Sequence, residues 1–68
     1  MTDALASEIM DRAVVGFGRP CATEIFPKEL RHPDQDGWWH VGTLTAEREE
    51  NRYSVYYHLE TGRGLLKK

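Results

Sequence analysis

The sequence predicts a small α+β domain in which an N-terminal amphipathic helix packs on an antiparallel sheet of about three strands, in the order αβββ. Residues 3–15 carry apolar side chains at helical spacing. Residues 38–45 and 51–59 alternate as strands do, and they flank the charged stretch 46–50 as a central hairpin over 38–59. With 68 residues the chain is predicted to form one domain, 1–68, near the smallest size that folds without a partner copy.

The predicted helix has identifiable ends. Its apolar stripe consists of Leu5, Ile9, Met10, Ala13 and Val14. Thr2 or Asp3 can accept backbone N–H bonds from the first turn, and Gly16 can end the helix because glycine adopts the left-handed conformation without steric cost. Glu8 stands four residues before Arg12, a spacing at which opposite charges stabilise an exposed helix surface.

The segments on either side of the hairpin are predicted to be short. Residues 21–26 alternate as an edge strand does, and Pro27 suits the first position of a helical turn over 27–32. Residues 33–37 contain proline, aspartate and glycine and are predicted to turn the chain. After the hairpin, residues 61–64 form a second turn, and Leu65 and Leu66 are candidates for a short closing strand.

The hairpin is the most informative part of the chain because both of its faces are apolar. Pairing Leu44 with Tyr53 assigns alternate residues to two faces. The first face holds Trp38, His40, Gly42, Leu44, Tyr53, Val55, Tyr57 and Leu59. The second face holds Trp39, Val41, Thr43, Thr45, Arg52, Ser54, Tyr56 and His58.

One helix can cover only one of these two faces. Leu44 and Val55 favour the first face, whereas Trp39 and Val41 leave the reverse arrangement open. In this register Trp39 lies opposite His58, and Val41 lies opposite Tyr56. The face that the helix leaves free is either covered by residues 19–36 or by the C-terminal leucines, or else it binds another molecule.

Composition and charge narrow the class of protein. Eleven acidic residues against nine basic ones give a net charge of −2, which is unfavourable for binding phosphates. Apolar residues make up 40% of the chain, but the longest apolar run, 13–17, is too short to cross a bilayer. The N-terminal residues lack the features of a secretory signal, and a lone Cys21 cannot form an internal disulfide. We therefore expect a cytoplasmic protein without a membrane partner.

No motif predicts a cofactor, a metal site or a catalytic residue. The glycines of residues 16–18 follow a helix, whereas phosphate-binding glycine loops precede one. Residues 34–37 resemble the middle of a calcium loop, but Gly42 stands where a bidentate glutamate belongs. The register puts His40 and His58 on opposite faces, which prevents a shared zinc ion within one chain. A zinc site across a dimer interface stays open, and we expect no enzyme.

The leading hypothesis is a stoichiometric protein-binding module. Trp, Tyr and Arg dominate the energetics of protein interfaces, and the second hairpin face combines all three. The candidate partner-binding residues are Trp39, Val41, Arg52, Tyr56 and His58, with Glu47, Glu49 and Glu50 of the hairpin loop as possible phosphate mimics. By analogy of size and charge, such a protein is of the kind that phages and other mobile elements use to inhibit a host defence or nucleic-acid-handling complex.

Two alternatives stay open. Trp39 and Tyr56 could stack the bases of single-stranded nucleic acid while basic residues contact its phosphates, although the net charge argues against this. The basic candidates are Arg52, Arg63, Lys67 and Lys68. The third hypothesis is a structural subunit that forms a homodimer or larger oligomer with copies of itself.

Overall fold

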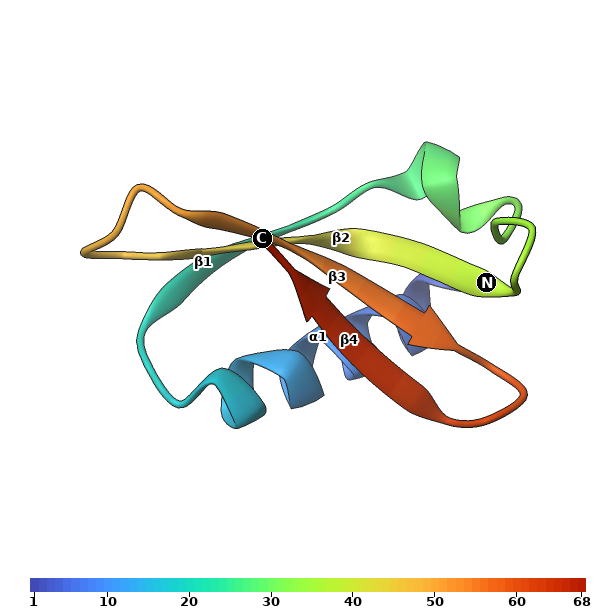
Figure 1. Ribbon diagram of the computed structural model, residues 1–68, viewed down its shortest axis with the longest axis horizontal. Coiled ribbons are helices and arrows are strands. Elements are labelled where there is room, and N and C mark those ends of the chain that lie inside the picture. The colour runs from blue at the N-terminus through green and yellow to red at the C-terminus, as the bar shows by residue number, and fades with distance from the viewer.

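The computed structural model describes all 68 residues and has four strands, one more than the sequence predicts. The elements are α1 (Asp3–Phe17), β1 (Cys21–Ile25), the 3-10 helix η1 (Pro27–Leu30), β2 (Trp38–Ala46), β3 (Arg52–His58) and β4 (Arg63–Lys67). The strands form one antiparallel sheet in the order β1-β2-β3-β4. Figure 1 shows α1 behind this twisted sheet, with β4 toward the viewer. The α+β class is therefore confirmed.

Helix α1 begins where the sequence predicts and ends two residues later. Thr2 accepts a hydrogen bond from the Leu5 N–H at its hydroxyl oxygen (3.2 Å), and the pair of Glu8 with Arg12 forms at 2.9 Å. The predicted end at Gly16 is wrong. Gly18 ends the helix instead, with φ of 73° and its N–H donated to the Val14 carbonyl (3.2 Å).

The extra helical residues have a packing reason. They place the Phe17 ring edge-on against Tyr53 of β3, with ring centroids 5.5 Å apart. The Arg19 guanidinium then lies 4.6 Å from the centroid of the same Phe17 ring. The end of the helix is thus fixed by contacts with the sheet, which local sequence does not reveal.

The hairpin register is confirmed at its loop end and wrong at its open end. Leu44 pairs with Tyr53 and Thr45 with Arg52, as predicted. Between His40 and Gly42 a β-bulge leaves Val41 without an opposite residue on β3. Beyond the bulge Trp39 pairs with Tyr57, and Trp38 pairs with His58. Because side chains alternate strictly along a strand, this one-residue shift exchanges the faces of residues 38–40.

Gly42 makes the close packing at the bulge feasible. A Cβ atom on Gly42 would lie 1.9 Å from the carbonyl oxygen of Glu24 on β1, far inside van der Waals contact. Only glycine leaves room for β1 at this point. Glycine within an otherwise apolar strand is the one mark of the bulge in the sequence.

The core lies between α1 and the sheet. It consists of Ala6, Ile9, Met10, Leu30, Val41, Leu44 and Val55. Leu44 and Val41 are completely buried, and Leu30 extends the core under η1. The short helix that Pro27 predicts therefore forms and contributes a core residue. No helix in the structure has the length and apolarity needed to span a membrane.

Candidate functional site

The face of the sheet opposite α1 is bordered along β2 by residues 26–37 and is otherwise formed by the strands themselves, and we call it the uncovered face. The register assigns to it Trp38, His40, Thr43 and Thr45 of β2, Arg52, Ser54, Tyr56 and His58 of β3, and Arg63, Leu65 and Lys67 of β4. Helix α1 packs on the other face, chiefly against β1, β2 and β3. The uncovered face is therefore a candidate site.

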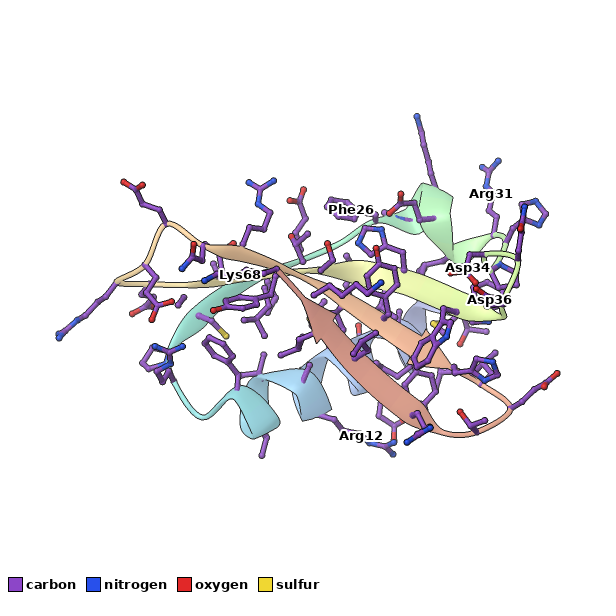
Figure 2. All side chains as sticks on the ribbon, in the orientation of Figure 1. Arg12, Phe26, Arg31, Asp34, Asp36 and Lys68 are labelled. Carbon is purple, nitrogen blue, oxygen red and sulfur yellow. The ribbon has the colours of Figure 1, made fainter.

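Aromatic rings on the uncovered face contact one another in two groups. His40 stacks on Tyr56 with ring centroids 4.9 Å apart and an interplanar angle of 23°, and Phe26 adds a third ring 5.6 Å from His40. Figure 2 shows Phe26 on the side of β2 away from α1. Trp38 and His58 form the second group, edge to face at 5.2 Å. All five rings are only half-buried.

Polar contacts fix the two histidine rings. His40 donates through Nδ1 to Glu29 of η1, and His58 donates through Nε2 to the Asp36 carbonyl oxygen (3.0 Å). The other nitrogen of each ring, Nε2 of His40 and Nδ1 of His58, is buried and has no hydrogen-bond partner in the chain. Each ring is therefore held in one orientation by a single hydrogen bond on one nitrogen.

The bulge also corrects the predicted separation of the histidines. His40 and His58 lie on the same face, not on opposite faces, because the one-residue shift at the bulge moves His40 to the face that carries His58. No group of three or more His, Cys, Asp or Glu side chains is arranged to hold a metal ion.

The structure retains part of the predicted site and replaces the rest. Arg52, Tyr56 and His58 lie on the uncovered face as predicted. Val41 is wrong as a partner-binding residue because the bulge turns its side chain into the core, where it is 0% exposed. Trp39 is half-buried opposite Tyr57, on the helix side.

The sequence prediction missed two residues of the site. Trp38 and His40 take the places that Trp39 and Val41 were expected to fill. Gly42 is the sequence feature that could have located the bulge, and with it the exchange of faces.

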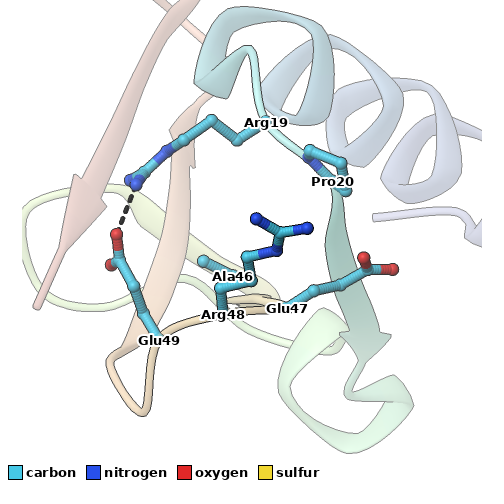
Figure 3. Close-up of a pocket in the computed structure, with 6 residues that line it drawn as sticks. All are labelled: Arg19, Pro20, Ala46, Glu47, Arg48 and Glu49. Atoms are coloured by element: carbon cyan, nitrogen blue, oxygen red, sulfur yellow. Dashed lines mark hydrogen bonds and ion pairs between the residues drawn. The ribbon is translucent and has the colours of Figure 1, made fainter.

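The acidic hairpin loop lies apart from the aromatic groups. Glu49 forms an ion pair with Arg19, as Figure 3 shows, and Glu47 donates its backbone N–H to the Pro20 carbonyl (3.2 Å). These residues and Arg48 line a hollow of about 330 Å³. The ion pair with Arg19 neutralises Glu49. Glu47 and Glu50 are exposed, so they alone remain as free carboxylates of the predicted acidic site.

The uncovered face is locally basic although the whole chain is acidic. Arg52, Arg63 and Lys67 lie on it, against two carboxylates, Glu24, which the β1 register places on the same side, and Glu29, which pairs with His40. The Lys67 ammonium lies 5.8 Å from the centroid of the Tyr56 ring, within range of a cation–π contact. The charge and the rings thus occupy one continuous surface.

No protein family, no curated protein and no solved structure matches this chain. A functional conclusion therefore rests on the physical character of the uncovered face.

Proposed function

We propose that the protein is a stoichiometric protein-binding module that docks on a larger partner through the uncovered face of its sheet. One observation carries the proposal: five aromatic rings lie on this face and stay half-buried, although residues 26–37 pack against the rings of His40 and His58. The closing strand β4 extends the face rather than folding over it. The C-terminal leucines therefore do not cover the face, and the segment 19–36 contacts it only in part.

The composition and size of the face suit a protein partner. Tyr56, Trp38 and Arg52 belong to the residue types that contribute most to interfaces, because they bury a large area and keep a polar group. A standard interface buries about 800 Å² on each side, roughly a sixth of the 4902 Å² surface of this chain. The stacked rings also lose little conformational entropy on binding, since their neighbours already restrict them.

A binding module of this kind acts by occupying its target. The proposal includes no catalytic step and no cofactor, and it extends to inhibition of a host defence or nucleic-acid-handling complex by a mobile element. Size and charge alone support that extension. A cytoplasmic location is part of the same proposal and is supported by the single free thiol of Cys21.

A second candidate is binding of single-stranded nucleic acid. Three basic side chains, Arg52, Arg63 and Lys67, share the face with Tyr56, which is the combination that stacks bases and contacts phosphates. The net charge of −2 opposes it, because phosphate binding depends on a favourable overall potential. The protein partner therefore remains the leading candidate.

The test is capture of a partner from cytoplasmic extract by the wild type and by two single variants. Tyr56→Ala removes the central ring of the uncovered face, and Val15→Ala changes an 81% exposed apolar residue on α1 as the matched control. We expect one partner at a fixed ratio, retained by Val15→Ala and lost from a folded Tyr56→Ala. Retention by Tyr56→Ala would contradict the proposal.

Two solution measurements separate the alternatives. Quenching of tryptophan fluorescence that saturates with single-stranded oligonucleotide would replace the proposal with nucleic-acid binding. Sedimentation at two protein concentrations detects self-association, and a dimer that dissociates in Tyr56→Ala would replace it with homo-oligomer formation.

A further inference from the structure

Strand β4 is an edge strand with a free hydrogen-bonding side. It pairs with β3 alone, and all five of its residues are exposed. None of the backbone hydrogen bonds outside the helices and strands reaches residues 63–67. Alternate N–H and C=O groups of β4 therefore point away from the sheet, in the pattern that pairs with another extended chain.

The two faces of β4 differ in chemistry. Arg63, Leu65 and Lys67 lie on the uncovered face, whereas Gly64 and Leu66 lie on the helix side. Leu65 is 41% and Leu66 37% exposed, so apolar area is available on both sides of the strand. An added strand would cover part of both leucines.

A groove on the helix side could receive apolar side chains of the added strand. It lies between α1 and β4, has a volume of about 300 Å³, and is lined mainly by apolar residues, among them Ile9, Ala13, Phe17, Val55, Tyr57 and Leu66. The groove exists because α1 packs chiefly on β1, β2 and β3 and leaves the helix side of β4 open. The opposite edge strand, β1, exposes Ala22, Thr23 and Glu24 instead of leucines.

Charge argues against a second copy of the chain as the occupant. The antiparallel register that pairs all of β4 with itself is centred on Leu65, and it sets Arg63 directly opposite Lys67 at both ends. Like charges in opposed positions destabilise a strand pair. The same two side chains would instead attract carboxylates on a neighbouring strand.

We propose that β4 binds an extended segment of the protein partner as a fifth strand, in which acidic residues alternate with apolar ones. The carboxylates lie on the uncovered face beside Arg63 and Lys67, and the apolar side chains lie on the helix side beside Leu66, in the groove. Backbone hydrogen bonds to β4 supply affinity, and the alternation of charge and apolar surface supplies specificity. The proposal rests on the protein-binding function and names the chemistry of the segment recognised.

A synthetic peptide tests the proposal without knowledge of the natural partner. The probe is an acetylated, amidated peptide of about seven residues, the length of a strand, in which valine alternates with glutamate. Its control replaces every glutamate with lysine. We expect the glutamate peptide to shift the NMR signals of the amides of residues 63–67 and to bind at least about tenfold more tightly than the lysine peptide. Equal binding of the two would overturn the proposal.

Backbone methylation distinguishes strand addition from adhesion of side chains. Two versions of the probe carry N-methyl groups on one or the other set of alternate residues, which blocks one or the other edge of the peptide strand. Addition to β4 uses one edge, so one version should lose binding and the other keep it. Equal loss or equal retention would show that β4 does not pair with the probe.

Variants of the protein complete the test. Lys67→Glu should weaken the glutamate peptide at least about tenfold, whereas Lys28→Glu, at an exposed position of η1, should leave binding within about twofold. An oligothymidylate of about eight nucleotides that binds β4 and displaces the peptide would assign the edge to nucleic acid instead. If no peptide binds but capture of the partner still depends on Tyr56, strand addition is wrong and the protein-binding function stands.

Discussion

The two faces of the sheet are built from different side chains, although the same strands supply both. The buried centre of the helix side is aliphatic, with residues such as Leu44 and Val55 almost completely buried against α1, and the aromatic residues Tyr53 and Tyr57 pack half-buried at its margin. The uncovered face carries rings and charges, and His40 and Tyr56, which stack on each other, are only half-buried. Aliphatic side chains need a covering layer, whereas aromatic residues with polar groups remain compatible with water and with a partner.

The largest loss of stability is expected when core volume is removed on the helix side. Leu44→Ala removes a completely buried side chain, so we expect unfolding free energy to fall by about 3 kcal/mol. Urea denaturation followed by circular dichroism measures it. As a control, Leu65→Ala on the uncovered face should cost less than about 1 kcal/mol. Similar losses at both positions would contradict the difference between the faces.

The β-bulge, which exchanges the faces of residues 38–40, provides the next test. Gly42→Ala would place a methyl group against the Glu24 carbonyl and force β1 away, so we expect a loss of about 2 kcal/mol. Gly16→Ala, within α1, meets no atom within 4 Å. It should raise stability by about 0.5 kcal/mol because alanine favours the helix. Thermal unfolding of the two variants compares them, and a neutral Gly42→Ala would be inconsistent with the close approach.

A smaller loss of stability is expected for Tyr56, a residue of the uncovered face that we expect to contribute more to binding than to folding. Tyr56→Ala breaks the stack on His40 and the contact with Lys67, yet leaves the core intact, so we expect a loss of about 1 kcal/mol. Equilibrium denaturation gives this value, and partner capture gives the effect on binding. A loss as large as that of Leu44→Ala would mean that Tyr56 is a core residue.

The smallest effect is expected for an exposed charge pair on α1. Arg12→Ala removes the exposed pair with Glu8, which at this spacing contributes about 0.3 kcal/mol. The loss should shrink further in high salt, because exposed charges are screened. Denaturation at two salt concentrations checks this, with Arg31→Ala as an unpaired control. A loss that persists unchanged in high salt would contradict an electrostatic origin.

Local patterns in the sequence predict most of the fold. Helical spacing and Thr2 locate the start of α1, and Pro27 locates η1, because both depend on neighbouring residues alone. The end of α1 was not predictable in the same way, since Phe17 remains helical in order to pack on Tyr53. The sequence only suggested strand β4 through its two leucines. The strand is defined by its pairing with β3, which a local pattern within residues 63–67 does not reveal.

The candidate site shows the same limit more sharply. A strict alternation of faces assigns Arg52, Tyr56 and His58 correctly, since β3 is regular. The alternation fails on β2, where one extra residue at Val41 reverses the assignment of Trp38 and Trp39. Both tryptophans are acceptable on either face by composition. Only the position of the bulge decides between them, and Gly42 is its one local indication.

The central claim is that the bulge puts His40 and Trp38 beside Tyr56 and His58 on a face left open for a partner. Nuclear Overhauser contacts between side chains of the free protein test it most directly. The account predicts strong contacts between the rings of His40 and Tyr56 and between those of Trp38 and His58, with the Val41 methyls contacting Ile9 or Met10 of the core. Strong contacts from Val41 to Tyr56 and from Trp39 to His58 would contradict it.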